Sequence, residues 1–144
     1  LRLGFRKVFL AALLHDCAKE MKPLKSEYPT KSSKVIHQYD GKTVAQSEYG
    51  IDDADILDAI EYHTTGRPDM TPLGKLIYVA DKLEPSRDFL GINDIRGLLK
   101  IDFQYGFLKL LERSVAYISG KGLPIDKLTM ATYNYYRNQS RAKK

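Results

Sequence analysis

The chain has 144 residues, of which 43% are hydrophobic and 28% are charged, as in an ordinary globular protein. This length fits a single domain that needs neither disulfides nor a structural metal to bury an adequate core. No apolar run approaches the roughly 20 residues of a membrane span, and no signal-peptide pattern occurs. The single cysteine, Cys17, cannot form an internal disulfide, which fits the reducing cytoplasm.

A net charge of +5 favours an anionic substrate or partner. Part of this excess is local, because the last eight residues, "RNQSRAKK" (137–144), contain four basic side chains and no acidic one. We expect this basic tail to be solvated and disordered. The chain has no nucleic-acid-binding motif and no basic stripe interleaved with aromatic residues, which argues against nucleic acid as the partner.

The first half of the chain shows mainly helical periodicity. Apolar side chains recur at helical spacing over residues 5–21, which predicts a helix there. Residues 22–34, "KPLKSEYPTKSSK", are rich in proline, serine and lysine and predict a loop. A weakly amphipathic segment follows at residues 35–49. The next helix begins at Asp52 or Asp53, either of which is a suitable N-cap, and runs toward His63.

The second half continues in the same way. Gly66 and Pro68 break the preceding helix, and Thr71-Pro72 is typical of an N-cap followed by proline at the first helical position. The helix that begins there ends before Pro85. Two further helical segments follow, at 94–118 with an interruption near 100–102 and at 124–136. Because no sustained alternation with a period of two occurs, the sequence predicts an all-α fold.

The chain has three histidines, His15, His37 and His63, and each lies near a predicted helix end. Asp16 follows the first of them, and Asp81 interrupts an otherwise apolar helix face. Imidazole nitrogen together with carboxylate oxygen suits intermediate divalent metals better than Ca²⁺, which prefers oxygen ligands.

Adjacent residues on a helix do not share a face. His15 and Asp16 can therefore converge on one ion only where it lies between them, most easily at a helix end. The second oxygen of Asp16 could bridge two metals, and two-metal sites hydrolyse phosphate esters and anhydrides. The spacing alone leaves structural explanations open: a core histidine, a helix-terminal acid at Asp16, or an ion pair at Asp81. No HExxH or CxxC pattern decides between them.

Three segments in series are more specific: "LLHDCAK" around His15, then an isolated His37, then "EYHTTGRPDMTPLGKLIYVADKLEPSRDF" from Glu61 to Phe89. In this order they resemble the HD-domain metal-dependent phosphohydrolases, and in particular the YqeK branch of symmetrical bis(5′-nucleosyl)-tetraphosphatases. The resemblance covers about residues 8–105. It implies an all-α bundle over the single domain 1–144.

The resemblance also implies roles for individual residues. The implied metal ligands are His15, Asp16, His37, His63 and Asp81. In this scheme Asp16 bridges two metals, with His15 and Asp81 on one and His37 and His63 on the other. Lys19 takes the place of a basic residue near the substrate phosphate. The implied substrate-binding residues are Lys19, Thr64, Thr65, Gly66, Arg67 and Arg87, in which the arginines suit phosphate oxygens.

The family pattern begins with one more metal histidine, on a helix before the HD pair. Only 14 residues precede His15, and none is histidine. The chain starts with Leu1 and not with methionine, so we expect the first ligand to lie in an upstream segment. In that case the metal at His15 and Asp81 has an incomplete ligand set, and this chain alone is not fully active.

The resemblance implies a hydrolase that cleaves diadenosine tetraphosphate, or a related dinucleoside polyphosphate, into two ADP. It implies a dinuclear metal centre, with iron as the first choice and manganese, cobalt or magnesium as alternatives. Two other functions stay open: an HD-type nucleotidase acting on mononucleotides, and a non-catalytic nucleotide-binding module appended to another domain. The sequence does not fix the oligomeric state.

Overall fold

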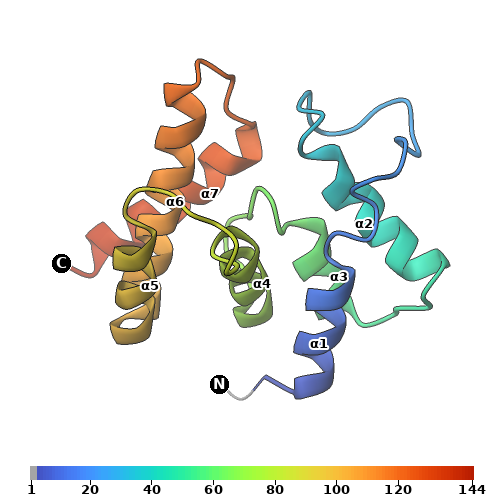
Figure 1. The fold of residues 1–144 in the computed structure, drawn as a ribbon, viewed down its shortest axis with the longest axis horizontal. Helices are drawn as coiled ribbons and strands as arrows, with labels where there is room; N and C mark the ends of the chain where they lie inside the picture. The colour runs from blue at the N-terminus through green and yellow to red at the C-terminus, as the bar shows by residue number, and fades with distance from the viewer. Residues whose placement is uncertain (1–2) are drawn as a thin grey trace. The chain divides into compact units, whose positions relative to one another are not determined.

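The computed structural model describes residues 3–144, which form seven helices and no strand (Figure 1). This confirms the predicted all-α fold. Within the same range, no helix is long and apolar enough to span a membrane. The helices group into two compact units, one made of residues 1–66 and 70–78 and the other of residues 67–69 and 79–144. The predicted single domain over 1–144 stays a prediction, and each unit is described by itself.

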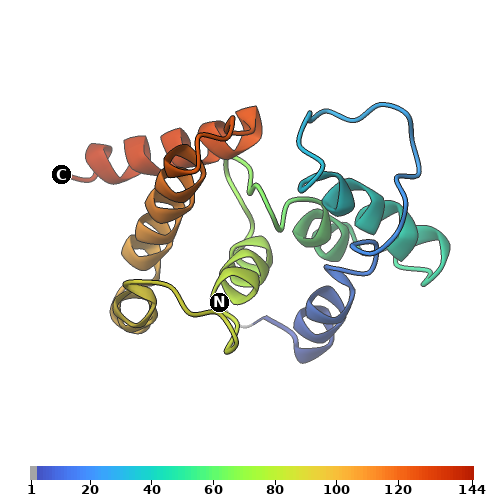
Figure 2. The ribbon, with the colours of Figure 1, turned by 45° about the horizontal axis from the view of Figure 1, so that its top comes forward.

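The first unit holds three helices and the beginning of a fourth. They are α1 (Phe5–Leu14), α2 (Ile36–Ser47), α3 (Ala54–Glu61) and α4 (Pro72–Lys82), which continues into the second unit. Helix α3 packs against both α1 and α2 (Figure 2). The core of this unit is a cluster of small and branched apolar side chains from all four helices: Ala11, Leu14, Ala45, Ile56, Leu57, Ala59, Ile60, Leu73 and Ile77. Burial of such side chains is the main stabilising contribution.

Gly41 allows α2 to approach its neighbours closely. A Cβ atom at this position would lie 3.1 Å from Cγ2 of Ile60 in α3 and 3.4 Å from the carbonyl oxygen of His15. Since glycine has no Cβ, the first turns of α2 can pack directly against α3 and against the end of α1. This close packing brings the segment that begins with His37 next to the segment that follows α1.

The second unit contains α5 (Ile92–Ile101), α6 (Phe103–Gly120) and α7 (Lys127–Ala142), with α6 packed against both of the others (Figures 1 and 2). Asp102 separates α5 from α6. Its backbone is extended, and its Oδ1 accepts a hydrogen bond from the backbone N–H of Tyr105 at 3.0 Å. The interruption predicted near residues 100–102 is therefore confirmed, and an N-cap explains it.

Helix α1 is shorter than the predicted helix over residues 5–21. It ends at Leu14, and residues 15–21 form tight turns in which N–H groups bond to carbonyls three residues earlier. The physical reason lies in the side chain of His15, whose Nδ1 donates to the carbonyl oxygen of Ala12 at 2.6 Å. In a continued α-helix that carbonyl would accept from the N–H of Asp16. The ring therefore competes with the helix for the same acceptor.

Helix α7 begins and ends later than the predicted helix over 124–136. Asp126 is its N-cap, with Oδ1 accepting from the N–H of Leu128 at 2.8 Å, and the helix continues to Ala142. It thus includes most of the basic segment 137–144, where we expected a disordered tail. Arginine, glutamine and alanine in this segment are good helix formers even without an apolar face.

We predict that Asp53→Ala lowers the free energy of unfolding by about 1 kcal/mol, the usual effect of losing an N-cap. Asp53 Oδ1 accepts from the N–H groups of Asp55 (2.9 Å) and Ile56 (3.2 Å) at the start of α3. Urea denaturation at pH 7 measures the difference. Asp52→Ala is the control, because Asp52 is the exposed neighbour, and an equal loss in both variants would contradict the capping role.

The difference in unfolding free energy between wild type and Asp53→Ala should also depend on pH. Burial raises the pKa of Asp53, but the two backbone N–H groups and Lys7 outweigh it and hold the pKa below its ordinary value. A lowered carboxyl pKa stabilises the fold above the pKa of the unfolded chain, and this contribution is lost as pH falls through the folded pKa. The difference between wild type and Asp53→Ala should therefore narrow in acid.

Candidate metal centre

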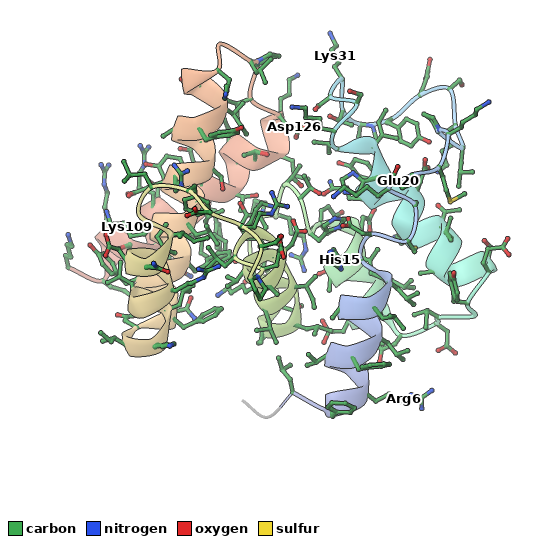
Figure 3. The ribbon with its side chains drawn as sticks, in the orientation of Figure 1. Arg6, His15, Glu20, Lys31, Lys109 and Asp126 are labelled. Atoms are coloured by element: carbon green, nitrogen blue, oxygen red, sulfur yellow. The ribbon has the colours of Figure 1, made fainter. Side chains whose placement is uncertain are left out.

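The centre begins where α1 ends. His15 is the residue directly after Leu14 (Figure 3). Its Nδ1 is bonded to the carbonyl of Ala12, and its Nε2 lies 3.5 Å from Oδ2 of Asp16. The two adjacent side chains converge because the chain leaves the helix between them. The pair thus lies at a helix end, and its role as a pair of metal ligands stays a prediction.

The two oxygens of Asp16 face different partners. Oδ1 lies 3.2 Å from Nε2 of His63 and 3.4 Å from Nε2 of His37. Oδ2 lies 3.5 Å from Nε2 of His15 and 3.4 Å from Nζ of Lys19. Four of the five predicted metal ligands therefore lie together, with the three histidines around the carboxylate of Asp16. The donor atoms of His15, Asp16 and His63 all lie within 4.8 Å of one another.

His37 and His63 reach Asp16 from two other elements. His37 is the second residue of α2, and His63 follows the end of α3 and is fully buried. Their Nε2 atoms are 3.0 Å apart, and the hydroxyl of Thr64 lies 3.4 Å from Nε2 of His37. The centre thus combines three chain segments that are distant in sequence.

The hydrogen bonds of the Nδ1 atoms leave the Nε2 atoms of the rings facing Asp16. Nδ1 of His63 lies 2.8 Å from the carbonyl of Ile60, and Nδ1 of His15 bonds to Ala12. A carbonyl only accepts, so both Nδ1 atoms carry the hydrogen, and each Nε2, whether it carries a hydrogen or a lone pair, is directed toward Asp16. Lone pairs and a carboxylate oxygen at such distances repel one another unless a proton or a metal cation lies among them. Oriented histidine rings of this kind are typical of metal ligands.

The electrostatics of the neighbouring groups agree with this assignment. The ring nitrogens of His37, and then of His63, hold the pKa of the Asp16 carboxyl far below its ordinary range, so the group is ionised. Burial raises the pKa of the Cys17 thiol, and its Sγ lies 3.6 Å from the carbonyl oxygen of Gly41. The candidate ligands at this place are nitrogen and oxygen atoms of His15, Asp16 and His63, a set that suits divalent transition metals.

The loop after His63 is partly buried and is held in place by hydrogen bonds. Thr65 is fully buried, and its hydroxyl donates to the carbonyl oxygen of Gly66 at 2.8 Å. Gly66 has φ of +70°, a conformation that favours glycine. The backbone N–H groups of Thr64 and Thr65 both donate to Oε1 of Gln38, a buried side chain in α2. Our sequence reasoning missed Gln38, for which the only local signal is a polar residue directly after His37.

The other predicted site residues belong to the second unit. Asp81 lies in α4, with Lys82 Nζ 3.2 Å from its Oδ2. Arg67 donates from Nη1 to the carbonyl oxygens of Pro68 (2.8 Å) and Asp69 (2.6 Å). Arg87 pairs with Glu84, Nε to Oε1 at 3.5 Å. The roles predicted for Asp81, Arg67 and Arg87 stay predictions.

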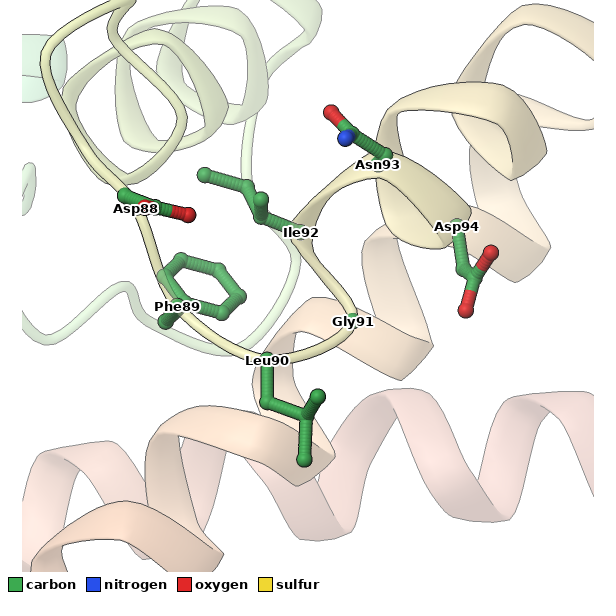
Figure 4. A pocket seen from close by; sticks show the side chains of 7 residues that line it. All are labelled: Asp88, Phe89, Leu90, Gly91, Ile92, Asn93 and Asp94. Carbon is green, nitrogen blue, oxygen red and sulfur yellow. The ribbon is translucent and has the colours of Figure 1, made fainter.

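The second unit also contains an open surface pocket of about 440 Å³ (Figure 4). Its lining is formed by residues 88–94, which are the loop before α5 and the first residues of that helix. One face of the Phe89 ring in this loop is stacked by the guanidinium of Arg113, whose Cζ lies 3.8 Å from the ring centroid. The pocket lining contains no histidine, so it offers no second metal centre of this type.

Comparison with known proteins identifies the class. The family model described as "HD domain" matches residues 4–86, which include the four converging residues. The chain belongs to the HD domain family.

Curated relatives are more specific. The chain is 37% identical to the "Bis(5′-nucleosyl)-tetraphosphatase, symmetrical" of Bacillus subtilis (strain 168), over 90% of this chain and 76% of that protein. It is 34% identical to the protein of the same name from Staphylococcus aureus (strain NCTC 8325 / PS 47), over 90% of this chain and 74% of that one. These similarities confirm the resemblance to the YqeK branch.

A solved structure agrees in fold. It is described as a predicted HD superfamily hydrolase involved in NAD metabolism from Clostridium acetobutylicum. The TM-score is 0.87 at 32% identity, and the match covers 94% of this chain and 78% of the other. The helical arrangement of this chain is therefore that of an HD superfamily hydrolase.

We predict that Asp16→Asn reduces bound metal by about tenfold or more, because the amide removes the charge that all three histidines face. Metal content after anaerobic loading with Fe²⁺, or loading with Mn²⁺, is measured by mass spectrometry. Glu20→Gln is the control, since Glu20 is an exposed carboxylate in the same segment (Figure 3). Equal metal content in Asp16→Asn and wild type would contradict the assignment.

Proposed function

We propose that this chain is a metal-dependent hydrolase that cleaves diadenosine tetraphosphate, or a related dinucleoside polyphosphate, symmetrically into two ADP. The names of the similar bacterial proteins support the substrate and the symmetry of cleavage. One structural observation carries the chemistry: a single carboxylate, Asp16, lies within 3.5 Å of nitrogen atoms from three histidines.

The proposal extends to the ligand arrangement. Asp16 would bridge two metals, with His37 and His63 beside Oδ1 and His15 beside Oδ2, and with Asp81 as a further ligand. We propose iron for both positions, with manganese, cobalt or magnesium as alternatives; nitrogen ligands favour the transition metals. When bound, such metals supply Lewis-acid stabilisation of phosphoryl charge and lower the pKa of coordinated water.

The residues of the chain itself bind and orient the substrate. Lys19 Nζ lies 3.4 Å from Oδ2 of Asp16 and is exposed, so one ammonium can contact both the carboxylate and a substrate phosphate. A positive charge fixed at this place stabilises the negative charge that develops on the phosphoryl oxygens. Arg67 and Arg87 are proposed to hold the remaining phosphates.

The two units differ in net charge, and this bears on how the first unit attracts a substrate phosphate. The first unit contains ten basic and ten acidic residues, while the second contains thirteen basic and eight acidic ones. The net charge of +5 thus belongs to the second unit. The net charge of the first unit therefore gives no attraction for a polyphosphate, and we propose that Lys19 and the metals provide it locally. The predicted cytoplasmic location stays a prediction.

Product analysis in ¹⁸O-labelled water tests the proposal. We expect diadenosine tetraphosphate to give two ADP, one of them with a single ¹⁸O in its terminal phosphate, detected by chromatography and mass spectrometry. ATP plus AMP would overturn the symmetrical assignment. Faster turnover of ADP or of deoxynucleoside triphosphates in parallel assays would favour the alternative of a mononucleotide phosphatase.

Lys19→Ala should lower kcat/KM for diadenosine tetraphosphate by about tenfold to a hundredfold, because it removes charge stabilisation near the reacting phosphate. Lys19→Arg should recover part of this loss. Lys22→Ala is the matched control, as Lys22 is an exposed basic residue three positions further along the chain. If both alanine variants lose activity equally, the effect is general electrostatic attraction and Lys19 has no special role.

A further inference from the structure

Gln38 is a fully buried amide at the beginning of α2, directly after His37. An amide removed from water destabilises the fold unless its donors and acceptor find partners. An apolar residue of similar size would fill this position without that requirement. The contacts of Gln38 therefore need an explanation beyond packing.

The amide is satisfied by the loop that follows His63. Its Oε1 accepts from the backbone N–H groups of Thr64 (3.1 Å) and Thr65 (3.2 Å), and its Nε2 donates to Oγ1 of Thr65 at 3.1 Å. Since two N–H groups point at one atom of the amide, that atom is the oxygen, which fixes the orientation of the side chain. Oγ1 of Thr65 in turn donates to the carbonyl of Gly66.

These hydrogen bonds connect the two histidines through their nearest neighbours in the chain. Gln38 follows His37, and Thr64 and Thr65 follow His63, so the amide spans the gap between the two ligand-bearing segments. The Nε2 atoms of the histidines are 3.0 Å apart and both lie within 3.4 Å of Oδ1 of Asp16. A metal site tolerates displacement of its ligands by only about 0.5 Å.

We propose that Gln38 is a positioning residue that holds His37 and His63 at the spacing needed for one metal ion. The inference rests on the metal centre of the proposed function. Gln38 does not touch the metal or the substrate; it acts through the backbone on either side of the two rings. Loss of contacts that orient metal ligands typically weakens metal binding by about 10- to 100-fold.

Another contact between α2 and α3 provides a matched control. Lys42 Nζ and Oε2 of Glu61 are 2.9 Å apart, and both side chains are partly exposed. This ion pair joins the same two helices, but it is not adjacent to either histidine in the chain. A variant that breaks it therefore separates general loosening of the α2–α3 contact from loss of ligand positioning.

The experiment is a Co²⁺ titration of the metal-free full chain, followed by the visible absorption bands that report the ligand geometry of bound Co²⁺. We expect Gln38→Met to raise the Kd for Co²⁺ by about 10- to 100-fold and to change the band pattern. Lys42→Met should keep the wild-type spectrum and a Kd within about twofold of wild type. Melting temperatures of all variants are measured in parallel.

A second pair of variants covers the case in which Gln38→Met does not fold. Thr65→Val removes the hydroxyl that Gln38 contacts, whereas Thr65→Ser keeps it. We expect Thr65→Val to raise the Kd for Co²⁺ and Thr65→Ser to restore a near-wild-type value. A structural role alone would lower the melting temperature of Thr65→Val without changing the Co²⁺ spectrum.

The outcomes distinguish this inference from the proposed function. If the wild-type chain binds no metal, the metal centre itself is wrong. If it binds Co²⁺ and the Gln38→Met and Thr65→Val variants bind it equally well with the same spectrum, only the positioning role is wrong. Equal weakening in Lys42→Met would also overturn the inference, because any loosening of the α2–α3 contact would then suffice.

Discussion

The function proposed for the first unit depends on the groups that surround one carboxylate, that of Asp16. Asp16 is approached within 3.5 Å by nitrogen atoms of His15, His37 and His63, which follow α1, begin α2 and follow α3. Such a polar cluster adds little to the stability of the fold, because its groups lose hydration when they come together. The apolar core of the unit holds the chain segments that carry the cluster. Packing of the helices is therefore needed to keep Asp16 and the three histidines close enough for the proposed metal binding.

The candidate ligands of the first unit lie at or beside helix ends and not in helix interiors. His15 follows α1 because its own ring takes the carbonyl of Ala12, and His63 follows α3 in a loop that turns at Gly66 with φ of +70°. Consecutive residues on a regular helix point in different directions. The chain can therefore direct His15 and Asp16 to one place only by leaving the helix between them. The absence of a side chain at Gly41 then lets α2 approach closely enough for His37 to reach the same place.

Much of this was predictable from the sequence because its signals are local. The N-cap at Asp53, the break near Asp102 and the order of the HD segments can all be read from short stretches. The end of α1 could not be read in this way, since the helical pattern of apolar residues continues past Leu14 and periodicity ignores competition between a side chain and the backbone. The role of Gln38 depends on contacts with Thr64 and Thr65, which lie 26 and 27 residues away and which no local pattern encodes.

Two polar contacts of α2 differ in charge and in directionality: Lys42 pairs with Glu61 at the end of α3, and Gln38 bonds to the loop that follows. An exposed ion pair such as Lys42–Glu61 is screened by water and tolerates many geometries. The buried amide of Gln38 has no net charge, but it fixes a donor and an acceptor in one plane. A carboxylate in its place would add negative charge one residue from a ligand and would lose the donor to Thr65. A neutral, directional group therefore orients the two histidines without changing the charge that the bound metal encounters.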